Sequence, residues 1–270
     1  MTTPYGSVDP SGHRQLVEMN VLGARVDPLT IASLNERVER LLENQQKSVV
    51  AYIHVHGVNL AYRDAALTRF FKNAEIVYCD GEGVRLGANL LGLHIPERIA
   101  LTDWVWDLFK ICQRQSASLY FLGSTQDVLE GAARKVKEKF PGLKLLGCHH
   151  GYFEKRGPSN DAVISEINRF GPDVLLVGFG MPIQERWLME SGDRLQVKLI
   201  LTVGSCFDYV SGRRRRCPRW MARHGLEWLF RLMQEPRRLF KRYIIGNPLF
   251  VARVVWAAVS QGFKSQGGER

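Results

Sequence analysis

Short apolar segments alternate with helical segments along most of the chain, and this alternation restricts the fold more than any other feature. The apolar segments are rich in Val, Ile and Leu and end near glycine or aspartate. Continuous apolar strands separated by helices are typical of a parallel sheet whose two faces are both covered. The segments expected as strands are 21–26, 48–55, 74–79, 118–122, 144–148, 174–177 and 197–203.

Helical periodicity fills the intervals between these strands, so we expect an α/β fold with a Rossmann-like, mostly parallel sheet and helices on both faces. The expected helices are 30–45, 58–73, 84–91, 104–115, 127–140, 160–170 and 183–191. After about residue 218 the chain reads as helices alone. The sequence thus predicts a flexible polar tail over 1–18, an α/β domain over 19–209 and a basic helical C-terminal appendage over 210–270.

Nearly all of the net charge lies in this appendage. Ten arginines and one lysine fall within 213–242, opposed only by Glu227 and Glu235, while the whole chain carries +10. Aromatic and aliphatic residues are interleaved with the arginines, which suits a surface that meets phosphate and apolar matter together. A charge run is often only a solvated face, but this imbalance points to nucleic acid, an anionic membrane or a phosphorylated ligand.

Several features indicate a cytoplasmic protein that meets a membrane only at its surface. The N-terminus has no apolar segment typical of a signal peptide. Five cysteines without CxxC spacing favour reduced thiols. We find no apolar run of the ~18–20 residues that a bilayer requires. The segment 249–263 is expected to lie in the interface as a helix too short to cross.

Four predicted strands end in small or polar residues, which predicts a ligand cleft at one edge of the sheet. Ligands of open parallel sheets bind beyond the carboxyl ends of the strands, where glycine lets backbone N–H groups approach phosphate. No P-loop and no GxGxxG motif is present, so we expect a nucleotide or nucleotide-sugar cleft of another kind. The four strand ends are Asp80-Gly81, Gly123-Ser124, 178–180 and Gly204-Ser205.

Each polar candidate at these ends has a plainer alternative. Asp80 could act as a general base or could bond the backbone of its own turn. Glu185 could be a favourable charge at a helix start, whereas Gln184 could read a base or a sugar hydroxyl. His54 fits a hydrogen-bonded core histidine better than a phosphate donor. No cluster has metal-ligand spacing.

Four longer segments resemble the WecG/TagA/CpsF family of bacterial glycosyltransferases, glycosyltransferase family 26. They are GFGMPIQE (178–185), VGSCFDYVSG (203–212), RCPRW (216–220) and GLEWLFRLMQEPRRLFKRY (225–243). The resemblance runs from about residue 19 to residue 247. It implies an inverting enzyme that transfers a hexose-type sugar from a UDP-sugar to a polyprenyl-diphosphate-linked glycan. The acceptor lies at the inner face of the cytoplasmic membrane, in cell-surface polysaccharide assembly.

The resemblance also implies roles for individual residues. The catalytic candidates are Asp80, as the proposed base, with Arg98 and Gln184. Tyr52 and His54 stand where the family often has a Thr-x-Asn motif, so the transferred sugar need not be N-acetylmannosamine. Substrate-binding candidates are Tyr52, His54, Asp103, Gly123, Gly180, Glu185, Gly204, Arg216, Arg223 and Arg231.

We expect arginines and helix N-termini, rather than a metal ion or other cofactor, to stabilise the departing UDP. Basic and aromatic residues of the appendage are the candidates for contact with an anionic membrane. Other functions that fit the sequence are nucleic-acid binding, although we expect no nucleic-acid partner, and non-catalytic binding of a nucleotide-sugar at a membrane. A homo-oligomer is compatible with the sequence. The membrane candidates are Arg214, Arg215, Arg219, Trp220, Arg237 and Arg238.

Overall fold

The computed structural model describes residues 18–44 and 46–266, and the tail expected over 1–18 lies almost entirely outside them. Its centre is a six-stranded, wholly parallel sheet of order β4-β3-β8-β7-β5-β6. The α/β, Rossmann-like prediction is confirmed. The strands are β3 Ser48–Ile53, β4 Ile76–Cys79, β5 Ser118–Gly123, β6 Lys144–His149, β7 Val174–Gly178 and β8 Leu199–Thr202.

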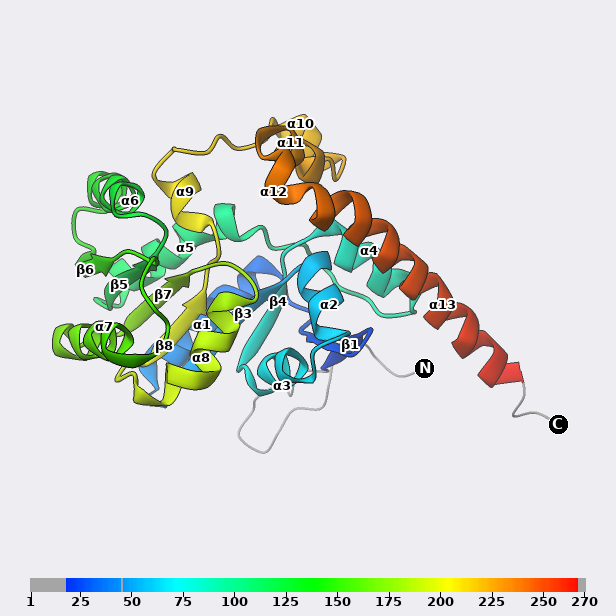
Figure 1. Cartoon of the computed structure of the whole chain (residues 1–270), viewed down its shortest axis with the longest axis horizontal. Coiled ribbons are helices and arrows are strands. Elements are labelled where there is room, and N and C mark those ends of the chain that lie inside the picture. Colours follow the sequence, from blue (N-terminus) through cyan, green and yellow to red (C-terminus); the bar gives the residue numbers. More distant parts are fainter. Residues whose placement is uncertain (1–17, 45, 267–270) are drawn as a thin grey trace.

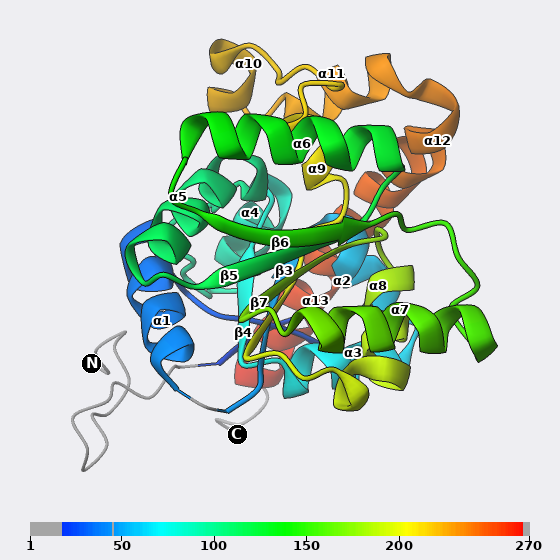
Figure 2. The same ribbon diagram turned by 90° about the vertical axis from the view of Figure 1, so that its left-hand side faces the viewer.

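Helices cover both faces of the sheet, which lies between them in Figure 2. One face is covered by α1 (Ile31–Glu43), α5 (Leu101–Arg114), α6 (Gln126–Lys139) and α9 (Cys206–Val210). The other is covered by α2 (Val55–Ala61), α3 (Ala65–Asn73), α4 (Glu82–Leu90), α7 (Gly157–Phe170) and α8 (Ile183–Ser191). Two apolar layers therefore bury the strands, and the edge strand β6 is the most exposed of the six.

Two of the predicted elements were wrong in detail. The strand expected over 21–26 is a small antiparallel hairpin outside the main sheet, β1 (Met19–Val21) and β2 (Ala24–Val26). The helix expected over 58–73 is divided into α2 and α3. Asp64 separates them because its carboxylate accepts the Ala66 N–H at 2.9 Å and so caps the start of α3.

The C-terminal region is helical, as expected: α10 (Arg219–Arg223), α11 (Glu227–Gln234) and α12 (Pro236–Phe240) precede a π-helical turn and α13 (Gly246–Gln266). Figure 1 shows α12 and α13 as one long helix that runs past α4 and α2. The start expected at residue 249 was therefore wrong. The π-helical turn, Lys241–Ile245, connects α12 to α13. Pro248, which has no N–H to donate, lies in the first turn of α13. The domain boundary at residue 210 stays a prediction.

Because α12 and α13 are continuous, this helix is longer than the 249–263 helix that the sequence predicted. Of the described residues, one helix, Pro236–Ser260, is long and apolar enough to cross a bilayer by length and composition alone. Only 17% of its most apolar stretch is buried. Its exposed large apolar side chains include Val251, Val255, Trp256 and Val259.

The opposite side of α13 is packed against the α/β body. Phe250 and Val254 are buried against α4, where a Cβ on Gly87 would lie 2.6 Å from the Phe250 ring. Asn59 of α2 donates to the Gly246 carbonyl at 2.7 Å and accepts from Arg253 at 2.7 Å. Glycine at position 87 thus permits the close approach that fixes the direction of the helix.

We predict that Phe250→Ala lowers the free energy of unfolding by about 3–5 kcal/mol, because it removes a buried aromatic ring and leaves a cavity. Trp256→Ala, on the same helix but 75% exposed, should change it by less than about 0.5 kcal/mol. Denaturant unfolding of the two variants compares them. Equal losses would show that α13 is not held by its inner face.

Candidate functional site

A cavity of about 1320 Å³ lies beyond the carboxyl ends of the strands. Its floor includes Tyr52, His54 and Asp80, together with the turns that follow β7 and β8. Its opposite wall comes from the segment after α9 and from α11 and α12, which stand above this edge of the sheet in Figure 1. The basic residues of that wall are Arg213, Arg214, Arg215, Arg231 and Arg238, and Arg242 of the following π-helical turn also lines the cavity.

Asp80 follows β4 and carries the carboxylate of the cavity floor. Its pKa is raised to about 7, mainly by burial and next by the negative charge of Glu227. The positive charges of Arg98 and Arg231 act in the opposite direction, as does a hydrogen bond from the Leu101 N–H. A carboxyl group with this pKa can accept a proton near neutral pH, as a general base requires.

An ion-pair network beside Asp80 joins the appendage to the α/β body. Glu227 of α11 accepts from Arg98 at 3.1 Å and from Arg216 at 3.2 Å. Arg216 also contacts Thr102 and pairs with Asp103 at the start of α5. None of Arg98, Asp103, Arg216 and Glu227 is part of the described cavity lining. Arg98 and Glu227 act on the cavity through the effect of their charges on Asp80.

Three arginines at the cavity each have a buried nitrogen without a hydrogen-bond partner among the described residues. These are Nη1 of Arg214 and Nε of Arg231 and Arg242. Arg231 otherwise donates to Ser205 at 3.4 Å, and Arg242 contacts the His54 ring. All three arginines line the cavity, so their guanidinium groups make this wall suited to an anion with several oxygens.

His54 caps α2 through Nδ1, which accepts the Gly57 N–H at 3.1 Å. Burial and the adjacent Arg242 hold its pKa well below the usual value, so the ring is neutral near pH 7. Tyr52 is buried, and its hydroxyl oxygen would lie 2.3 Å from a Cβ at Gly204. Both side chains are at the cavity: Tyr52 lies on β3, the strand next to β4, and His54 directly follows β3.

Gln184 and Glu185 are fully buried below the cavity and are not part of its lining. The Gln184 carbonyl oxygen accepts from Gly204 N at 3.0 Å and Gly180 N at 3.2 Å. Its amide donates to Glu185 at 2.8 Å. Burial raises the pKa of Glu185 to about 7. Gln184 thus ties together the turns after β7 and β8, and its effect on a ligand passes through them.

The predicted glycines serve different purposes. Gly123 (φ 144°) is packed against β7, where a Cβ would lie 2.4 Å from the Gly178 carbonyl oxygen, and it is absent from the described cavity lining. Gly180 (φ 81°) faces open space at the cavity, and Gly204 also lines it. Close packing of strand ends therefore requires glycine at 123, while Gly180 leaves backbone accessible to a ligand.

The membrane candidates are distributed over two environments. Arg214, Arg215 and Arg238 line the cavity, and Arg214 pairs with Glu235 at 2.8 Å. Trp220 is 60% exposed and Arg237 is exposed. The side chains of Arg219 and Arg223 lie outside the described part of the structure. A membrane role for this set stays a prediction.

Sequence reasoning missed several lining residues. Arg242 lies in the basic segment, but only the fold brings it to His54. Lys155 comes from a loop with no motif; its ammonium lies 3.7 Å from the Phe153 ring centre and 4.3 Å from that of Phe179. Burial lowers the pKa of Lys155 to about 8. Over 18–44 and 46–266, no three His, Cys, Asp or Glu side chains converge in a group able to hold a metal ion.

Comparison with known proteins gives a consistent result. The sequence profile of the Glycosyl transferase WecG/TagA/CpsF family matches residues 19–264. Similar curated proteins include the N-acetylglucosaminyldiphosphoundecaprenol N-acetyl-beta-D-mannosaminyltransferases of Staphylococcus aureus strains MW2 and MRSA252. Each is 24% identical over 242 residues, which cover 89% of this chain and 93% of the relative.

We predict that Glu227→Gln lowers the pKa of Asp80 below its native value of about 7. The substitution removes a nearby negative charge and frees the positive charge of Arg98, and both effects favour the ionised carboxylate. NMR titration of the Asp80 carboxyl carbon measures the change. Glu235→Gln, also in α11–α12 but not among the groups that shift Asp80, is the control; an unmoved pKa in Glu227→Gln would contradict the assignment.

Proposed function

Because the chain belongs to the WecG/TagA/CpsF family of glycosyltransferases, we propose that it transfers a sugar from a UDP-sugar to a polyprenyl-diphosphate-linked glycan. The observation that carries this proposal is one cavity that holds a carboxylate with a pKa of about 7 opposite partly unpaired guanidinium groups. Membership in a family of enzymes favours catalysis over the non-catalytic alternatives that the sequence left open.

The proposed reaction is a direct displacement with inversion. A hydroxyl oxygen of the acceptor sugar bonds to the anomeric carbon of the donor while the bond from that carbon to the UDP oxygen breaks. Asp80 takes the hydroxyl proton, and the electron pair of the broken bond stays on UDP. The pKa of Asp80 lets the ionised base exist near neutral pH while it remains basic enough to take the proton.

The departing diphosphate gains negative charge in the transition state, and the appendage supplies fixed positive charge nearby. Arg214 and Arg231 enter the cavity from the wall opposite Asp80, with N–H groups that the protein leaves unpaired. Guanidinium groups already in place stabilise such charge without rearranging. We propose that these arginines, rather than a metal ion, carry the charge.

The donor nucleotide fits the end of the cavity formed by the turns after β5, β7 and β8. Backbone at Ser124, Gly180 and Gly204 lies there, close to the ring of Phe179 and the ammonium of Lys155. An aromatic face suits a base, and an ammonium group suits the phosphates attached to it. Tyr52 and His54, next to Asp80, would then contact the transferred sugar.

We further propose that the protein is cytoplasmic and binds peripherally to the inner face of the membrane. The acceptor of the Staphylococcus relatives is, by their names, attached to undecaprenol. The exposed apolar side chains of α13 suit the headgroup region, as do the exposed Trp220 of α10 and Arg237 of α12. Each basic residue near an anionic leaflet adds about 1 kcal/mol of attraction.

We predict that Asp80→Asn lowers the transfer rate by ~10²–10⁴-fold, since the amide cannot take the proton. A UDP-sugar panel with short-chain polyprenyl-diphosphate glycans as acceptors measures the rate, and UDP binding should be retained. Asp161→Asn, an exposed aspartate of α7, is the matched control. Transfer at the native rate by Asp80→Asn would remove Asp80 as the base.

EDTA should leave the transfer rate unchanged, because guanidinium groups are proposed to stabilise the leaving diphosphate. The same assay, run with EDTA and then with added Mg²⁺ or Mn²⁺, measures this. A rate abolished by EDTA and restored by either ion would show that a metal ion carries the charge instead.

A further inference from the structure

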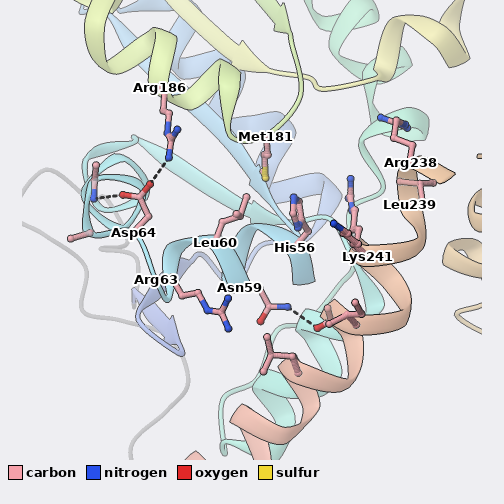
Figure 3. Close-up of a pocket in the computed structure, with 16 residues that line it drawn as sticks. His56, Asn59, Leu60, Arg63, Asp64, Met181, Arg186, Arg238, Leu239 and Lys241 are labelled. Carbon is pink, nitrogen blue, oxygen red and sulfur yellow. Dashed lines mark hydrogen bonds and ion pairs between the residues drawn. The ribbon is translucent and has the colours of Figure 1, made fainter. Parts of the chain in front are cut away.

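A second cavity, of about 830 Å³, adjoins the catalytic cavity. It lies between α2 and the start of α3 on one side and α12, the π-helical turn and α13 on the other, with Arg186 of α8 at its rim (Figure 3). Met181, Arg238 and Arg242 line both cavities. The two spaces therefore meet at these residues.

The second cavity is strongly basic. Five of its lining side chains are cationic, Arg63, Arg186, Arg238, Lys241 and Arg242, against the single carboxylate of Asp64. Asp64 is already paired with Arg186 at 3.0 Å, and Arg238 is paired with Glu235. Among the described residues no carboxylate pairs with Arg63, Lys241 or Arg242. This leaves several positive charges for a bound anion.

Figure 3 shows His56 on α2 and Lys241 on the π-helical turn, from the two sides of this cavity. Burial and Arg242 lower the pKa of His56 to about 4, so its ring is neutral near pH 7. A neutral imidazole can share a phosphate oxygen with the ammonium group by donating an N–H. Because the neutral ring carries no positive charge, it does not increase the repulsion among the cations around it.

The same cavity has an apolar side. Leu60 and Met181 contribute from the α/β body, and Ile245 and Leu249 lie one turn apart on the long C-terminal helix. Ile245 is 55% exposed, so this side is open to apolar matter. A ligand that satisfies both sides has an anionic group next to a hydrocarbon chain.

The proposed reaction involves two diphosphates, one on UDP and one on the lipid acceptor. The catalytic cavity offers the strand-end turns that suit a nucleotide, whereas the second cavity is walled mainly by helices and carries leucine and isoleucine. We propose that the second cavity binds the diphosphate and first isoprenyl units of the acceptor. This assignment rests on the proposed function. Arg242, at the junction, would contact the acceptor diphosphate while the attached sugar extends toward Asp80.

Binding of farnesyl diphosphate to the full-length chain tests the proposal, with inorganic pyrophosphate and UDP as comparison ligands. Lys241→Ala and Arg63→Ala should each weaken farnesyl diphosphate about tenfold by removing a charge-assisted contact, and leave UDP unchanged. Ile245→Ser should weaken farnesyl diphosphate about fivefold but not pyrophosphate. Arg134→Ala, at an exposed arginine of α6 that lines neither cavity, is the control.

Two results would overturn the proposal. One is that these variants leave farnesyl diphosphate binding unchanged, or that UDP abolishes this binding completely by competition. The other is pyrophosphate binding as tightly as farnesyl diphosphate with no effect of Ile245→Ser, which would leave an anion site without a lipid.

The transfer assay separates this inference from the function on which it rests. If the native chain transfers sugar and Lys241→Ala leaves the acceptor KM unchanged, the cavity assignment fails alone. If the native chain transfers no sugar from any UDP-sugar, the proposed function fails, whatever farnesyl diphosphate binding shows. A raised acceptor KM with an unchanged donor KM supports both.

Discussion

The pairing of Glu227 with both Arg98 and Arg216 joins the C-terminal helices to the sheet, and the chemistry of the cavity depends on it. All three side chains are mostly shielded from water, so removing one partner would leave the others with uncompensated charge. The same carboxylate lies near enough to Asp80 to raise its pKa. One interaction therefore closes the cavity and adjusts the base within it.

The remaining arginines show how the charge of the appendage is divided. Arg214 and Arg238 share Glu235, and Arg214, Arg231 and Arg242 each have a buried N–H group that no described residue satisfies. Burying an incompletely paired guanidinium group destabilises the folded protein. An anionic ligand that pairs with the group offsets this cost when it binds. The charge surplus of the segment is thus turned largely toward the two cavities, with Arg237 and Trp220 on the outside.

The sequence predicted those features that local pattern determines. In a chain that alternates strands and helices, an apolar run such as Ser48–Ile53 forms a strand that is buried on both faces. Asp80 directly follows another strand of this kind. Features set by contacts between distant segments were not predictable. Nothing near Gly123 shows that its neighbour is Gly178, and Gln184 ties two turns together only once β7 and β8 are adjacent. The helix through Pro248 was not predicted, because proline usually interrupts a helix and only the structure shows the π-helical turn that precedes it.

The position of the appendage also bears on when Asp80 is an effective base. Burial is the largest cause of its raised pKa, and part of the cavity that buries it is the wall formed by α11 and α12. With that wall displaced, water would reach Asp80 and Glu227 would be farther away, and both changes lower the pKa. Loss of Arg231 acts the other way, but it ranks below both. The closed arrangement is therefore the one in which the carboxylate is basic enough to take a proton from a hydroxyl.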